Sequence, residues 1–354
     1  MIFSQEKKRI AKERFTFFLY EIALVFVFLF ILLLLPVFLI PLIAEEESNL
    51  YGILFYSIRA VIVFLGIPLI LYLTNLLFES QKRLILDEDV TPSMGHLKLY
   101  KMSRKNYRYQ ILYGFLLFFL VFIPIDFFTY LLIPGTIGYQ AIVLGIRSTN
   151  LYLFSDNYFI FLISAIIIQF SVAFTEETIA RGFFAKRGSE YFLKMSAVII
   201  SSLYFGLGHL AYLLDAYAWY PVLWFIQAFI VGIILALFVL RKKWIFPAII
   251  AHTLNNIVSA HTIWSFWQGN NFEVITFFLY IPLFIIGVLF VVVCMLLVWD
   301  FSSIKEALLN GFNTIKTYFK RDSKESTFGD VVFRAFVDIL IGSLIFLLGL
   351  LIAI

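Results

Sequence analysis

The sequence predicts an all-α polytopic transmembrane helical bundle with about nine spans (eight to nine) and a cytoplasmic N-terminus. Hydrophobic residues make up 62% of the 354 residues, charged residues make up 14%, and the mean hydropathy is +0.96. This composition excludes a soluble globular protein, in which about half of the residues are apolar. Repeated apolar runs of about 20 residues or more favour membrane helices over a membrane barrel.

The apolar runs place the spans along the chain. The first run, 17–43, is longer than the apolar core of about 7 to 15 residues in a cleaved signal peptide, so we interpret it as a span. A polar segment, 79–110, separates the second span from the third, and a weakly polar loop precedes the fourth. The predicted spans are 17–43, 57–78, 111–133, 157–187, 193–214, 218–240, 244–264, 274–298 and 331–354.

Between the last two spans, apolar residues recur at helical spacing while lysines occupy the other faces. This pattern predicts an amphipathic helix at about 302–320 that lies on the inner leaflet. The apolar positions are Ile304, Leu308, Phe312, Ile315 and Phe319.

The positions of lysine and arginine predict the orientation of the bundle. With nine spans, every Lys and Arg except Arg59 and Arg147 falls on the same side as the N-terminus. Cytoplasmic loops carry an excess of these residues, so that side is predicted to be the cytoplasm. Arg59 lies near the outer end of its span, where its side chain can reach the headgroups.

We expect one membrane domain in three parts. Residues 1–156 hold spans one to three with the cytoplasmic loop 79–110. Residues 157–265 form the core, spans four to seven, and residues 266–354 hold the last spans and the interfacial helix. Nothing in the composition indicates nucleic acid as a partner. Three residues carry no predicted role in a site: Cys294, His96 and His261.

Span four carries ionisable side chains before it ends, at Glu176, Glu177 and Arg181. Such groups are costly inside a membrane and indicate a functional site by default. Arg181 lies four residues after Glu177, on the same helical face, and can neutralise it. Glu176 is rotated by about 100° and is free to face another element. The alternative interpretation is an ion-paired helix end without a further role.

A histidine in span five, His209, lies four residues after Phe205. Gly206 and Gly208 lie between these two residues and are expected to allow close helix approach. The rise of about 1.5 Å per residue places His209 and Glu176 at a similar depth in the membrane.

Span seven carries a second histidine, His252, four residues before Asn256. This spacing puts both side chains on one helical face. At about 1.5 Å per residue, His252 also lies at the depth of Glu176. We therefore expect side chains from three spans to meet, although a single intramembrane histidine is more often a packed, hydrogen-bonded residue.

The three motifs together resemble the CPBP family, which comprises CAAX prenyl endopeptidases and bacteriocin-processing (Abi) intramembrane proteases. The motifs are Glu-Glu-x-x-x-Arg, Phe-x-x-x-His and His-x-x-x-Asn, and the resemblance covers about residues 164–258. It implies hydrolysis of peptide bonds in a membrane cavity open to the cytosol, with a peptide, prenylated or otherwise membrane-anchored protein as substrate.

The resemblance also implies a role for each motif residue. Glu176 would be the general base that activates water, assisted by His209. His252 and Asn256 would stabilise the oxyanion, Glu177 and Arg181 would form a structural ion pair, and Phe205 would line the site. Such residue types suit this chemistry, because a carboxylate can take a proton from water and donors can be aimed at a developing oxyanion.

No cofactor is favoured, but zinc remains an alternative. Two histidines and a glutamate, here Glu176, His209 and His252, are also the ligand set of a catalytic zinc site. We favour a glutamate mechanism, because Asn256 is a natural oxyanion donor and a poor zinc ligand.

Two other functions compete with proteolysis. One is a non-proteolytic membrane scaffold or bacteriocin self-immunity protein that binds a membrane-protein partner. The other is a transporter with Glu176 and the histidines as a proton relay, against which no paired halves are found in the sequence. The layout predicts a multi-pass protein of a plasma membrane, and we expect a bacterial one.

Overall fold

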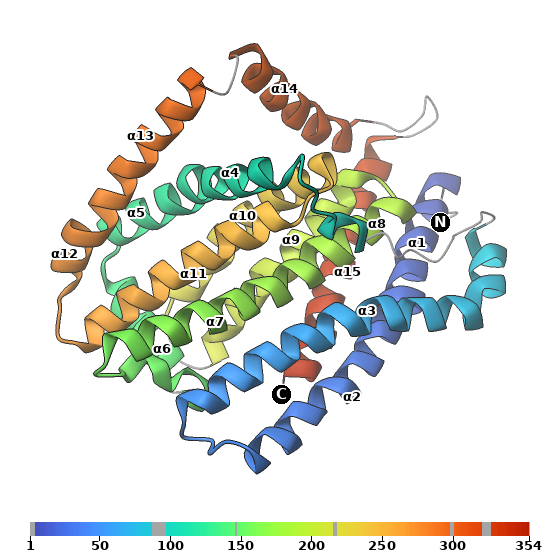
Figure 1. Cartoon of the computed structure of the whole chain (residues 1–354). Coiled ribbons are helices and arrows are strands. Elements are labelled where there is room, and N and C mark those ends of the chain that lie inside the picture. The colour runs from blue at the N-terminus through green and yellow to red at the C-terminus, as the bar shows by residue number, and fades with distance from the viewer. Residues whose placement is uncertain are drawn as a thin grey trace.

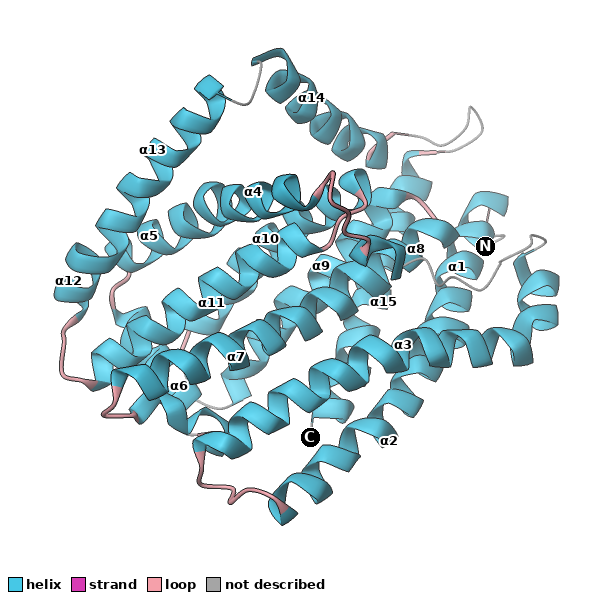
Figure 2. Cartoon of the chain, in the orientation of Figure 1, coloured by secondary structure: helices cyan, strands magenta, loops and turns pink. Residues whose placement is uncertain are grey.

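The computed structural model describes residues 4–86, 97–145, 147–214, 218–297, 301–320 and 327–353, and the side chains of 81–86, 301–304, 307–308 and 351–353 are not described. His96 lies outside the described residues. Over these ranges the regular structure consists of helices alone (Figure 2). The predicted all-helical class is confirmed.

Eight described helical segments are long and apolar enough to cross a membrane. They are Gln5–Leu42, Asn49–Ser80, Tyr107–Leu132, Tyr158–Tyr191, Lys194–Leu214, Tyr220–Lys242, Phe272–Leu297 and Phe328–Leu350. The remaining predicted span corresponds to α11 (Phe246–Trp267). This helix has 22 residues, a length within the range of the eight segments, but its most apolar stretch is more polar than theirs. It packs against α4 (Tyr107–Leu117) and α7 (Tyr158–Glu177) inside the bundle.

The first helix begins earlier than the apolar run predicted. It runs without a break through α1 (Gln5–Phe17), η1 (Phe18–Ala23), α2 (Leu24–Leu39) and η2 (Ile40–Leu42). A long-range contact holds its basic beginning: Arg14 is buried, and its Nε lies 3.0 Å from Oδ1 of Asp338 in α15 (Phe328–Ala353). The charged N-terminal stretch is therefore part of the bundle.

The second helix, α3 (Asn49–Leu86), also begins before its predicted span at 57 and packs antiparallel to α2 (Figure 1). Arg59 lies within it, with its guanidinium 5.0 Å from the centre of the Phe55 ring. The third span consists of α4, η4 (Phe118–Phe122) and α5 (Ile123–Leu132).

The expected loop between spans three and four is folded. It contains α6 (Gly135–Gly145) and the 3-10 helix η5 (Ser148–Phe154), which pack against α11 and α3. The small and apolar residues of this connection let it pack on the bundle: Ala141, Val143 and Leu153 are almost fully buried. Both elements cover one end of the core helices.

Four helices form the centre of the bundle in Figure 1: α7, α9 (Lys194–Leu210), α10 (Tyr220–Lys242) and α11. Asn157 caps α7, because its Oδ1 accepts hydrogen bonds from the amides of Phe159 and Ile160. Prolines in the first turns fix the starts of α10 and α11. The segment after α7 continues as η6 (Thr178–Ala185) and α8 (Lys186–Tyr191).

The C-terminal part holds α12 (Phe272–Ile275), η8 (Thr276–Tyr280), α13 (Ile281–Leu297), α14 (Phe301–Tyr318) and α15. Helix α14 occupies the segment predicted to be amphipathic; its place on a membrane surface stays a prediction, and of its apolar positions Ile304 and Leu308 have no described side chains. Figure 1 shows α1 and α8 at one end of the bundle and α6 and α12 at the other. We call these the cation-rich end and the opposite end.

Candidate active site

Glu176 and Glu177 are the last two residues of α7, directly before the π-helical segment η6. The sequence pattern predicted a regular α-helix here. Short π-helical segments inside α-helices are rare and occur often at functional sites. The hydroxyl of Ser201 in α9 donates to the carbonyl oxygen of Ala180 in η6 over 2.7 Å, which ties the segment to α9.

Glu177 and Arg181 form a fully buried pair. Glu177 Oε1 lies 3.0 Å from Arg181 Nη1, and both side chains are 0% exposed. The Arg181 guanidinium also lies 4.2 Å from the centre of the Phe205 ring, a cation–π contact. A buried charge is costly without a partner, so each side chain depends on the other.

His252 contacts both glutamates. Its Nδ1 lies 2.9 Å from Glu177 Oε1, and its Nε2 lies 3.4 Å from Glu176 Oε2. An ionised carboxylate only accepts hydrogen bonds, so Nδ1 carries the hydrogen that points at Glu177. The ring is fixed further by Phe122, which stacks on it at 5.9 Å, and by Phe205, which meets it edge-on at 5.7 Å.

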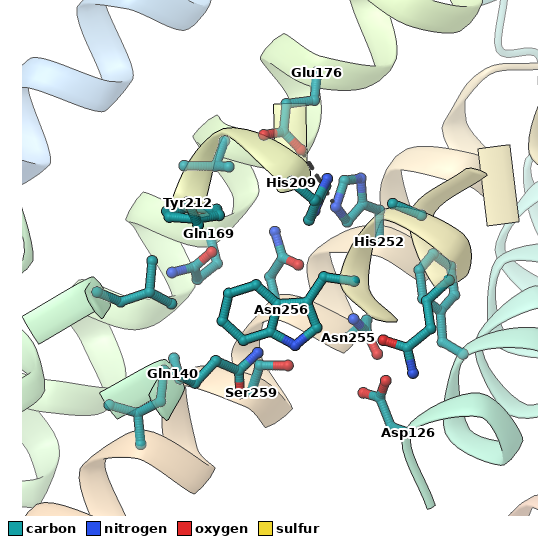
Figure 3. A pocket seen from close by; sticks show the side chains of 18 of the residues that line it. Asp126, Gln140, Gln169, Glu176, His209, Tyr212, His252, Asn255, Asn256 and Ser259 are labelled. Atoms are coloured by element: carbon teal, nitrogen blue, oxygen red, sulfur yellow. Dashed lines mark ion pairs between the residues drawn. The ribbon is translucent and has the colours of Figure 1, made fainter. Parts of the chain in front are cut away.

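His209 is oriented by its own helix. Its Nδ1 lies 3.0 Å from the carbonyl oxygen of Phe205, one turn earlier in α9, and the Phe205 ring packs against it at 5.0 Å. A carbonyl only accepts, so Nδ1 is the donor and Nε2 is left for another partner. Figure 3 shows His209 beside Glu176 and His252 at one end of a cavity.

The two glycines near His209 differ. A Cβ at Gly206 would lie 3.1 Å from the ring and the carbonyl oxygen of Phe225 in α10, so this glycine does permit a close approach. A Cβ at Gly208 would have no neighbour within 4 Å. The expectation for Gly208 is wrong, because that residue faces open space.

The cavity next to these residues has a volume of about 350 Å³. Its lining includes Glu176, Phe205, His209, His252 and Asn256, so residues from α7, α9 and α11 meet at one space. Of the two lining residues in contact, Glu176 and His252, the Glu176 side chain is 40% exposed, whereas the His252 side chain is 6% exposed.

The lining also contains polar residues that the sequence motifs did not single out. In α11, Asn255 and Ser259 share the cavity face with His252 and Asn256, and periodicity along that helix could have identified them. Other elements contribute Asp126, Gln140 and Gln169 (Figure 3). Oδ2 of Asp126 is buried and has no hydrogen-bond partner among the described residues.

The alternative zinc ligands are Glu176, His209 and His252, all among the described residues, and they are not gathered as a metal site. Within the described ranges, no group of three or more His, Cys, Asp or Glu side chains has the arrangement needed to hold a metal ion. A histidine that binds zinc commonly directs its other nitrogen at a carboxylate, as His252 does at Glu177, so zinc stays the alternative to the glutamate mechanism.

Residues 157–258 match the family model described as type II CAAX prenyl endopeptidase Rce1-like. The matched segment begins at the cap of α7 and ends in α11, so it contains every predicted site residue from Glu176 to Asn256. The resemblance to the CPBP family is thereby confirmed for this part of the chain. No curated protein and no solved structure was found that matches the chain.

Proposed function

We propose that this protein is an intramembrane endopeptidase that hydrolyses a peptide bond with water activated by Glu176. The family match implies a membrane protease of the CAAX or CPBP type. The observation that carries the finer proposal is the exposure of Glu176: 40% of its side chain faces space, while its neighbour Glu177 is fully buried.

In this mechanism Glu176 takes a proton from a cavity water as the water oxygen attacks the scissile carbonyl carbon. The same carboxyl then returns the proton to the leaving amine, so its charge is restored at the end of the cycle. In the neutral His209 ring the hydrogen sits on Nδ1, which donates a hydrogen bond to the carbonyl oxygen of Phe205. Nε2 can therefore accept a hydrogen bond from the water.

Oxyanion stabilisation is assigned to His252 and Asn256, which lie one helical turn apart and line the same cavity. The Asn256 amide is a donor in any state, and His252 donates from Nε2 when its ring is protonated. Such donors are most effective where water is scarce, because their interaction with the developing charge is weakly screened.

Glu177 acts in this mechanism through His252. Its carboxylate holds Nδ1 at 2.9 Å and thereby fixes the direction of Nε2, while Arg181 balances its charge. Glu177 and Arg181 are therefore positioning residues, and the predicted structural ion pair gains a link to the site.

The substrate class that fits is a peptide or a segment of a membrane-anchored protein. A cavity of about 350 Å³ accepts a few side chains at a time, which favours a scissile bond in an extended segment. We also propose, from the sequence, that the protein can bind a second membrane protein and that it resides in the plasma membrane of a bacterium.

A comparison of membrane peptidomes tests the function. Cells with the wild type, Glu176→Ala and Glu273→Ala are compared; Glu273 is an exposed carboxylate in α12 and serves as the matched control. We expect peptides that are present with the wild type and the control and absent with Glu176→Ala. If Glu176→Ala makes the same peptides, or complements a deletion fully, the proposal fails and the non-proteolytic scaffold takes its place.

A further inference from the structure

The cavity lies on one side of the candidate catalytic residues. Among the described residues of the core, the lining of α7 runs from Ile168 to Glu176, and that of α11 runs from His252 to Ile263. Helix α7 runs toward the cation-rich end and α11 runs away from it (Figure 1). Glu176 in α7 and His252 in α11 are therefore the lining residues closest to the cation-rich end, and the cavity extends from them toward the opposite end.

The other elements agree with this direction. Helix α10 contributes residues only from its first half, Trp224 to Val231, and this half starts at the opposite end. The folded connection α6 and η5, which covers the opposite end, contributes Gln140, Leu144 and Arg147. Arg147 is exposed, so the lining reaches the molecular surface there. Its guanidinium lies 5.3 Å from the centre of the Tyr212 ring, another lining residue.

Toward the cation-rich end the site is covered by an aromatic cluster around Tyr100. The Tyr100 ring packs on Phe64, Phe174 and Phe246, with centroid distances of 5.0, 5.7 and 5.8 Å, and its hydroxyl bonds to that of Thr178. Tyr100 belongs to the 3-10 helix η3 (Leu97–Tyr100).

Two further contacts close the same side. The amide of Ile245 donates to the carbonyl oxygen of Leu99 over 3.2 Å, which fixes η3 to the start of α11. The buried pair of Glu177 and Arg181, with Phe205 over the guanidinium, fills the space behind Glu176.

We propose that the substrate segment enters from the opposite end of the bundle and not from the cation-rich end. Because the cation-rich end is predicted to be cytoplasmic, the substrate would be a chain segment on the outer side of the membrane, such as an exported peptide or the outer part of an anchored protein. This proposal rests on the proposed function for its substrate and differs from the cytosolic opening that the family resemblance implied.

Cysteine labelling tests the route of entry without any need for proteolysis. The only cysteine, the buried Cys294, is replaced by alanine. Single cysteines are then placed in the cavity, as Leu144→Cys or Gln140→Cys, and at exposed reference sites at the two ends, as Glu46→Cys and Lys98→Cys. Intact cells and inverted membrane vesicles are treated with a membrane-impermeant maleimide.

We expect both cavity cysteines to react in the preparation in which Glu46→Cys reacts, and to be protected where only Lys98→Cys reacts. Reaction on the Lys98 side, or on neither side, would overturn the proposal. The Glu176→Ala variant should label in the same way. If the cavity cysteines label as expected but the protein shows no proteolysis, the proposed function fails and the route of entry stands. If the protein is proteolytic but the cavity cysteines label from the Lys98 side, the route of entry fails and the proposed function stands.

Discussion

His252 Nδ1 lies 2.9 Å from Glu177 Oε1, and the same carboxylate oxygen lies 3.0 Å from Arg181 Nη1. One oxygen atom thus joins a buried ion pair within one helix to a histidine of another helix. The fold and the candidate site share this carboxylate. Its removal should therefore lower both the stability of the protein and its catalytic rate.

Replacement of Glu177 by glutamine should destabilise the protein. The variant leaves the Arg181 guanidinium buried without a counter-charge, and breaking such a pair typically costs about 3–5 kcal/mol. Unfolding of the detergent-solubilised protein measures the change, with the exposed Glu273→Gln as control. An unchanged midpoint of unfolding would show that the ion pair does not stabilise the bundle.

The double variant Glu177→Gln with Arg181→Met separates the two effects. It removes both charges, so much of the lost stability should return. The turnover number should remain low, because His252 still lacks the carboxylate that orients it. Full activity in the double variant would contradict a positioning role for Glu177.

Substitution Asn256→Ala should lower kcat on the order of a hundredfold or more and change KM little. The amide is assigned to charge that develops only in the transition state, and loss of one such donor has this effect. Steady-state kinetics of the reconstituted protein give both constants, with the exposed Asn270→Ala as control. A higher KM at unchanged kcat would instead identify Asn256 as a residue that binds the substrate.

Two glycines of α9 form a matched pair for a packing test. At Gly206 a new Cβ would press on Phe225 at 3.1 Å, so Gly206→Ala should destabilise the protein by roughly 1–3 kcal/mol. At Gly208 the Cβ meets nothing within 4 Å, so Gly208→Ala should be neutral or stabilise the helix by up to about 1 kcal/mol. Equal effects of the two variants on the unfolding midpoint would contradict the packing of α9 on α10.

Removal of metal ions should leave the activity in place. In the proposed mechanism Asn256 stabilises the oxyanion without a metal, and among the described residues the three alternative zinc ligands, Glu176, His209 and His252, are not gathered as a metal site. The assay compares protein dialysed against a chelator with protein dialysed against buffer. Loss of activity that zinc alone restores would favour the metal mechanism.

The sequence was sufficient for the fold class and for the residues that meet at the site. Helical spacing placed His252 and Asn256 on one face, and depth counted from the cationic ends brought Glu176 and the histidines together. It could not show that His252 contacts Glu177 as well as Glu176, because that depends on how α11 is rotated against α7. The π-helical segment after Glu177 is likewise set by contacts with α9, such as Ser201 to Ala180.

The errors at element boundaries have the same origin. The chain before residue 17 lies outside the first apolar run, yet it forms helix α1, in which Arg14 is paired with Asp338, more than 300 positions later. The connection 134–156 has the glycine, proline and weak polarity of a loop. Its helices form because α3 and α11 offer surfaces on which Ala141 and Leu153 can be buried.

Hydrolysis of a peptide substrate by the purified, reconstituted protein tests the central claim most directly. The initial rate is compared between the wild type and Glu176→Gln, a variant of nearly the same shape that cannot take a proton from water. We predict that the wild type cleaves the peptide and that Glu176→Gln, folded to the same midpoint, loses cleavage by several orders of magnitude. Cleavage by Glu176→Gln at the wild-type rate would contradict the role of Glu176 as the general base.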